Sequence, residues 1–113
     1  MNYIFSAIFL YFFLGFLLYI FQRRIVFNKS GHPGKPKDYN LDNTEEIYIK
    51  TEDNLKLLSW YHKGNNSLPL IVYFHGNSFH IGDRAYRIKR YIEKNWSVLL
   101  VSWRGFGGNK GNP

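Results

Sequence analysis

The longest apolar stretch lies at the start of the chain. Residues 3–21 contain no charged side chain, and Ser6 is their one strongly polar residue. At about 1.5 Å per residue, a helix of this length spans a bilayer core of roughly 30 Å. The rest of the chain, about 90 residues, is too small to surround a helix that is apolar on every side. The pattern therefore predicts an N-terminal transmembrane helix over residues 3–21, with the lipid bilayer as its partner.

The charges around this stretch predict its type and orientation. The first basic residues, Arg23 and Arg24, follow the apolar run, whereas a cleavable signal peptide has its positive charge first and a small-residue cleavage site after its apolar centre. We therefore expect an uncleaved signal anchor in a single-pass membrane protein. The positive-inside rule places Arg23, Arg24 and the soluble portion on the cytoplasmic side.

Two alternating stretches predict a β-hairpin. Thr44–Lys50 places Ile47 and Ile49 on one face, and residues 55–62 alternate in the same way. Residues 52–54, which are typical of a turn, connect the two stretches by a short loop, so we expect an antiparallel pair of strands.

A continuous apolar run predicts the central strand. Leu70–Phe74 is rich in β-branched and aromatic residues, and Pro69 and Gly76 flank it. Such a run is typical of a parallel strand that is covered on both faces. A second apolar strand over residues 97–102 follows a helical segment, so the two strands form a βαβ unit with a right-handed crossover.

The helix of this unit is predicted over residues 81–95. Ala85, Ile88 and Ile92 recur at helical spacing and form the face that packs on the sheet. Gly82 or Asp83 is expected to cap its start.

The remaining segments read as a connector and a loop. Residues 22–43 contain two Gly and two Pro residues that exclude a regular element through the middle of the connector, although residues 25–27 either extend the anchor or dock on the body. Residues 103–113 form a Gly-rich loop without a phosphate-loop pattern. The chain thus divides into an anchor (3–21), a connector (22–43) and an α/β body (44–113).

Charge and composition exclude several classes of function. The net charge is +7, but the basic residues cluster after the apolar run and on the predicted helix beside acidic ones, so we expect no nucleic-acid partner. The chain has no Cys, which excludes disulfides and thiolate metal sites. His75 and His80 lack a suitably spaced third ligand, so neither a metal nor another cofactor is predicted.

Candidate chemistry lies at the end of the central strand. Ligands of open α/β sheets bind at the carboxyl ends of strands, where His75, Gly76 and Asn77 lie. The backbone N–H of Asn77 can point at negative charge on a substrate oxygen, although spacing alone favours a bond within the loop. Ser78 imitates a nucleophile elbow, but no His follows His80 to activate it, so a polar loop residue is the favoured interpretation.

Together these features resemble the α/β-hydrolase superfamily, and more closely its membrane-anchored serine-hydrolase branch. Residues 52–57 are similar to the family's D-G-x-x-L turn, residues 72–77 to its strand ending in His-Gly-Asn, and residues 101–111 to its D-Y-R-G-x-G-x-S-x-G segment. The resemblance covers residues 45–113 and the anchor.

The resemblance implies an eight-stranded, mostly parallel sheet and hydrolysis of esters, thioesters or amides. It implies that the backbone N–H of Asn77 is an oxyanion-hole donor and that His75 and Gly76 shape the turn. It places Arg104 and Gly105 in the loop after the next strand. In the family, the nucleophile elbow, the acid and the catalytic His come after the segments matched here.

The sequence therefore predicts the first portion of a hydrolase. We expect a partial sheet, composed of the hairpin and one βαβ unit after the transmembrane helix, that is inactive alone. The parallel edge beyond Val101 is expected to be unpaired, and a second polypeptide is a candidate to complete the sheet. Two alternatives stay open, namely a membrane-anchored interaction module that uses this edge and a small enzyme that uses Ser78.

Overall fold

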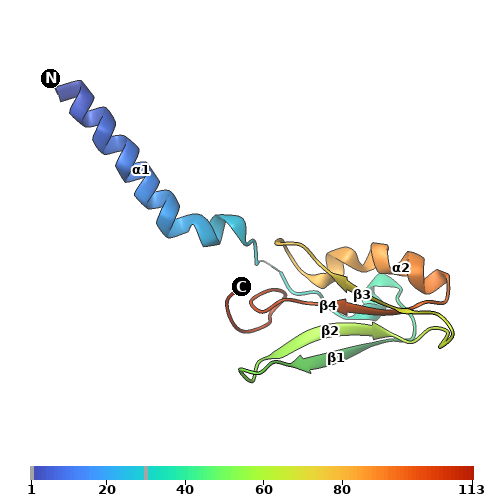
Figure 1. Cartoon of the computed structure of the whole chain (residues 1–113). Helices are drawn as coiled ribbons and strands as arrows, with labels where there is room; N and C mark the ends of the chain where they lie inside the picture. Colours follow the sequence, from blue (N-terminus) through green and yellow to red (C-terminus); the bar gives the residue numbers. More distant parts are fainter. Residues whose placement is uncertain (1, 30) are drawn as a thin grey trace.

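The computed structural model describes residues 2–29 and 31–113 as a mixed α/β protein (Figure 1). In chain order its elements are α1 (Asn2–Val26), the 3₁₀ turn η1 (Pro36–Tyr39), β1 (Thr44–Lys50), β2 (Lys56–His62), β3 (Leu70–Phe74), the 3₁₀ turn η2 (Ile81–Arg84), α2 (Ala85–Glu93) and β4 (Ser97–Val101).

Helix α1 projects away from the body (Figure 1), and none of its described residues is buried. By length and composition it is suited to cross a membrane. It ends at Val26, past the predicted limit at Phe21, so Ile25 and Val26 extend the helix. Phe27 instead docks on the body, with its ring edge-on to that of Phe106 at 6.4 Å between centroids.

The connector after α1 is more ordered than its composition predicts. Pro36 begins the turn η1, because a fixed φ suits the first position of a helical turn. The turn brings Tyr39 against Trp60, with ring centroids 5.5 Å apart, and the Tyr39 hydroxyl donates to the Pro33 carbonyl at 2.7 Å. Leu41, just beyond it, is buried in the core. The expectation that Pro and Gly exclude regular structure here is therefore wrong for η1.

The hairpin forms as predicted. Strands β1 and β2 pair antiparallel, with Ile47 opposite Ser59 and Tyr48 opposite Leu58. Leu58 and Trp60 lie on the buried face of β2, in keeping with the alternating pattern.

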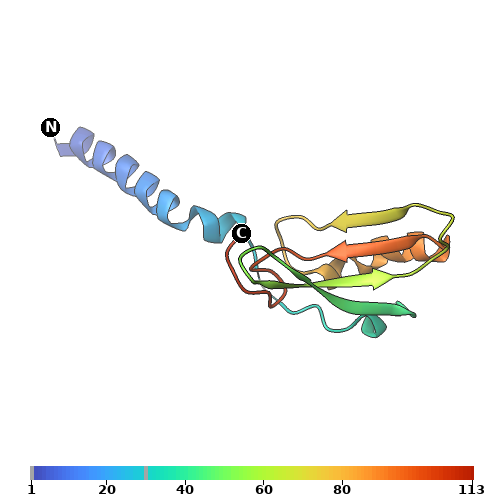
Figure 2. The ribbon, with the colours of Figure 1, turned by 60° about the horizontal axis from the view of Figure 1, so that its bottom comes forward.

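The strand order is β1-β2-β4-β3, which corrects the expected position of the free edge. Strand β4 pairs with β2 on one side and with β3, in parallel, on the other. The parallel edge therefore belongs to β3, at the outside of the sheet in Figure 2, and Val101 lies in an interior strand.

Strand β3 also differs from the expectation of burial on both faces. Leu70, Val72 and Phe74 are 46–52% exposed, whereas Ile71 and Tyr73 pack against the core. The described part of the chain places α2 and the connector on one face of the sheet only, so the other face of β3 stays open.

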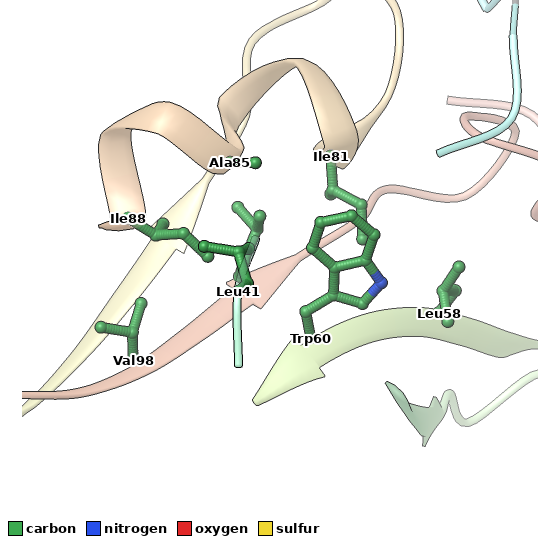
Figure 3. Close-up of a cluster of buried hydrophobic side chains, with 8 residues drawn as sticks. Leu41, Leu58, Trp60, Ile81, Ala85, Ile88 and Val98 are labelled. Carbon is green, nitrogen blue, oxygen red and sulfur yellow. The ribbon is translucent and has the colours of Figure 1, made fainter. Parts of the chain in front are cut away.

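The core lies between the sheet, α2 and the connector (Figure 3). Its buried residues are Leu41, Leu58, Trp60, Ile81, Ala85, Ile88, Val98 and Leu100. The predicted face of Ala85 and Ile88 points into this cluster, and Ile92 packs at its margin. The predicted caps are wrong, because Gly82 and Asp83 lie within η2 and Arg84 takes the cap position of α2.

Candidate functional site

The segments that follow β3 and β4 meet at one end of the sheet, because the two strands run parallel. They line a pocket of about 470 Å³. Its walls are Phe27, His75, Gly76, Asn77, Trp103, Arg104, Phe106 and Pro113. The candidate turn and the Arg-Gly-Phe segment, which the sequence places far apart, therefore contribute to the same pocket.

His75 is held inside this site and is 3% exposed. The backbone N–H of Trp103 donates to His75 Nε2 at 3.4 Å, and the Trp103 indole donates to the His75 carbonyl at 2.8 Å. Burial lowers the pKa of His75, and the positive charge of Arg84 adds to this effect. A neutral imidazole that accepts from Trp103 connects the ends of β3 and β4.

Asn77 joins the turn to the end of α1. Its side-chain Nδ2 donates to the Val26 carbonyl at 3.0 Å, and its own carbonyl accepts from the Asn28 N–H at 3.2 Å. Asn28 in turn accepts from the N–H of Phe79 at 2.7 Å, beside an isolated parallel bridge between Asn28 and Ser78. Within residues 2–29 and 31–113, the backbone N–H of Asn77 has no recorded acceptor.

Gly76 leaves space at the pocket wall. A Cβ at this position would have no heavy atom within 4 Å, and its φ is not among the positive values of the chain. Neither the backbone nor the packing of the described residues therefore requires glycine here. The open space lies at a wall of the pocket, where a ligand could approach the backbone.

Ser78 has no base beside it in the described part of the chain. Its Oγ lies 3.5 Å from Asn77 Oδ1, while the Nδ1 atom of His80 lies 3.7 Å from a carboxylate oxygen of Asp83. Among the described residues, no group of three His, Asp or Glu side chains is placed to hold a metal ion.

The segment after β4 is a closed loop. Gly105, Gly107, Gly108 and Gly111 all have positive φ, which only glycine adopts without strain. Phe106 in this loop is 1% exposed, and its ring lies edge-on to that of His75 at 5.3 Å between centroids. The sequence predicted a Gly-rich loop here, and the Gly105 N–H closes it by donating to the Lys110 carbonyl at 3.1 Å.

Two residues of this loop, Arg104 and Asn109, make polar contacts that carried no sequence signal. Asn109 Oδ1 accepts from the Leu58 N–H at 2.9 Å, and its Nδ2 donates to the Trp103 carbonyl at 3.2 Å. Arg104 forms a bidentate pair with Asp53, at 2.8 and 3.1 Å, which lowers the pKa of that carboxyl. Leu58 and Asn109 lie 51 residues apart, as do Asp53 and Arg104, so neither pair could be found from spacing.

Relatives of the chain are found among both bacterial and fungal proteins. It is 31% identical to an uncharacterized protein of Mycobacterium tuberculosis, Rv2307c, over 88% of this chain and 37% of that protein. Protein bem46 of Schizosaccharomyces pombe is 32% identical over 88% of this chain and 36% of that protein. YNL320W of Saccharomyces cerevisiae, an uncharacterized membrane protein, is 28% identical over 85% of this chain and 36% of its own length. No protein-family model matches the chain.

Solved structures of an esterase from Pyrococcus furiosus, Pf2001, share the fold. One superimposes with a TM-score of 0.55 and 23% identity over 77% of this chain and 34% of the esterase. The chain thus spans just over a third of the curated relatives that it matches. It folds as a partial α/β-hydrolase-like sheet, a hairpin plus one βαβ unit, after an apolar N-terminal helix.

Proposed function

We propose that this chain supplies the oxyanion-hole portion of a membrane-anchored serine hydrolase that acts on ester, thioester or amide bonds. The observation that carries the proposal is the pocket at the end of β3 and β4, where Gly76 leaves the backbone accessible and the Asn77 N–H has no recorded acceptor among the described residues. A positioned backbone N–H stabilises the negative charge that develops on the oxygen of an acyl group under attack.

The 113 residues are proposed to be inactive alone. The only serine in the candidate turn, Ser78, makes no hydrogen bond to an imidazole of the described residues. A serine hydroxyl needs such a base to become a nucleophile. The nucleophile, the acid and the catalytic His would come from further polypeptide that completes the sheet beside β3, the free parallel edge.

Two measurements, one on the full chain and one on a fusion protein, test this assignment. The chain alone, in mild detergent, should not react with a fluorophosphonate probe, and labelling at Ser78 would contradict the proposal. Residues 1–113 fused to the unmatched remainder of the Pyrococcus esterase should hydrolyse p-nitrophenyl esters, and Ser78→Ala should leave that activity unchanged. A fusion that unfolds cooperatively but hydrolyses no ester would also contradict the proposal.

The anchoring of the body to the cytoplasmic face is part of the same proposal. Helix α1 has no buried residue in its described part and is apolar enough to span a bilayer, and Arg23 and Arg24 follow its apolar part. Positive charge is retained on the cytoplasmic side during insertion. Protease added outside intact cells should spare the body, whereas degradation of residues 44–113 there would reverse the orientation.

A second candidate function, a membrane-anchored interaction module, is favoured by the edge strand. Strand β3 has an unpaired edge within the described sheet, and Leu70, Val72 and Phe74 are exposed beside it. Such an edge accepts a strand from another polypeptide. On this alternative, a stoichiometric protein partner would co-purify with the chain and would be lost from a Leu70→Lys, Val72→Lys variant.

A further inference from the structure

A basic pocket lies where α1 meets the body. It has a volume of about 890 Å³, and its charged walls are Arg23, Arg24 and Lys29. Its apolar walls include Phe21 and Ile25, and no acidic side chain of the described residues lines it. A cavity of this size accommodates a small organic molecule or a headgroup.

Two of these three positive side chains, Arg23 and Lys29, are held by hydrogen bonds to residues 112 and 113. Arg23 Nη2 donates to the Pro113 carbonyl at 2.9 Å, and Lys29 Nζ donates to Asn112 Oδ1 at 3.1 Å. Asn112 Oδ1 is a neutral amide oxygen. The ion pairs with Asp or Glu over residues 2–29 and 31–113 involve Arg104 and His80, so these three side chains have no Asp or Glu partner there. A guanidinium has five N–H donors and an ammonium three, which leaves most of them for a ligand.

The pocket continues into an apolar groove on α1. Arg24, Phe21 and Ile25 line both the basic pocket and a groove of about 380 Å³. The remaining walls of the groove are Leu14, Leu17 and Leu18, further into the apolar helix. A ligand that fills both spaces has an anionic head and a long apolar tail.

The position of the pocket along α1 matches the depth of lipid phosphates. If residues 3–21 fill the hydrocarbon core, Arg23 and Arg24 lie within the next helical turn, at the level of the headgroups. This step rests on the membrane anchoring that is part of the proposed function.

We propose that this junction binds one anionic phospholipid, with its phosphate against Arg23, Arg24 and Lys29 and an acyl chain in the groove of α1. Arginine is suited to this role because its planar fork binds two phosphate oxygens at once. The site adjoins the candidate catalytic turn, since Phe27 and Pro113 line both pockets and Asn77 donates to the Val26 carbonyl. A bound lipid thus fixes the turn at the membrane surface.

Lipid retention by the full chain tests this site. The protein is placed in phosphatidylcholine nanodiscs that contain a minor fraction of phosphatidylglycerol, and the lipids that stay bound after release are identified by native mass spectrometry. We expect enrichment of phosphatidylglycerol on the wild type and a loss of about tenfold or more in Arg23→Gln, Arg24→Gln, Lys29→Gln. The matched control Arg87→Gln, Arg90→Gln, Lys94→Gln removes the same charge from α2 and its end and should keep the enrichment. An equal loss in both variants would overturn the proposal.

Two further arms separate this site from related explanations. The variant Arg23→Lys, Arg24→Lys keeps the positive charge but removes the planar guanidinium groups. If the phosphate binds at a defined site, the enrichment of phosphatidylglycerol falls several-fold. Unchanged enrichment would indicate diffuse electrostatic attraction and would overturn the proposal. Displacement of the lipid by excess glycerol 3-phosphate would show that a free phosphate suffices and would also overturn it.

Co-elution with the nanodisc reports the anchoring separately. Wild type that co-elutes without lipid preference contradicts only the lipid site, and wild type that stays outside the nanodisc contradicts the anchoring as well.

Discussion

The segments after the two parallel strands, β3 and β4, lie side by side and differ in how their polar groups are used. The loop after β4 is closed by its own bonds, by glycines of positive φ and by the buried Phe106. The turn after β3 has the open Gly76 and an Asn77 N–H without a recorded acceptor in the described chain, and it is bonded to the segment that follows α1. The first segment is closed on itself, whereas the second leaves one backbone N–H and open space at the pocket wall.

The largest expected difference in stability is between alanine substitutions of the phenylalanines in the two segments. Phe106→Ala should lower the free energy of unfolding by about 3–5 kcal/mol, because it removes a buried ring and leaves a cavity. Phe79→Ala should cost much less, since Phe79 is 45% exposed. Urea unfolding of the full chain in mild detergent measures both. Equal losses would show that the turn is packed as closely as the loop.

A smaller contrast is expected between the asparagines. Asn109→Ala should cost about 1–3 kcal/mol, because it leaves the Leu58 N–H of β2 without its acceptor. Asn77→Ala removes an exposed bond to Val26 and should cost about 1 kcal/mol or less. The same urea titrations compare the variants. A greater loss for Asn77 would assign it a structural role.

The glycines should differ by about 1 kcal/mol in stability. Gly108→Ala is expected to destabilise by about that amount, because φ is +85° and the new Cβ would lie 2.9 Å from His32 Cδ2. Gly76→Ala should change stability by about 0.5 kcal/mol or less, since its added methyl meets open space. That methyl should nevertheless lower ester hydrolysis by the fusion enzyme. Unaltered hydrolysis would place the substrate elsewhere.

The smallest expected effect is the pH dependence that His75 gives to stability. Its folded pKa lies below the ordinary value of 6.5, so the unfolded chain binds more protons at acidic pH. The stability that the neutral His75 contributes is present above pH 6.5, and it is lost as the pH falls from there through the folded pKa. His75→Gln should reduce the slope of the unfolding free energy against pH by the equivalent of up to one bound proton. Urea titrations at several pH values measure this slope. An unchanged slope would contradict the burial of a neutral imidazole.

The elements of the body were predictable because their patterns are local. Alternation in β1 and β2 and the spacing of Ala85, Ile88 and Ile92 each depend on one segment and one buried face. The strand order and the exposure of β3 depend on which elements cover each face, and a continuous apolar run carries no information about that.

The site was predictable only in part for a related reason. The strand-end position of His75, Gly76 and Asn77 follows from the order of elements along the chain. The bond from Asn77 to Val26 and the pair of Arg104 with Asp53 each join residues 51 positions apart, so they appear only in the folded chain. The pocket wall formed by Phe27 likewise requires the docking of the connector.

The most direct test of the account compares two substitutions of Asn77 in the fusion enzyme. Asn77→Pro removes the backbone N–H, whereas Asn77→Ala keeps it and removes only the side-chain amide. If this N–H stabilises the oxyanion, kcat falls by about 100-fold to 1000-fold in the Pro variant. The Ala variant then stays near the parent, and both variants unfold cooperatively. Equal activity of the two folded variants would contradict the account.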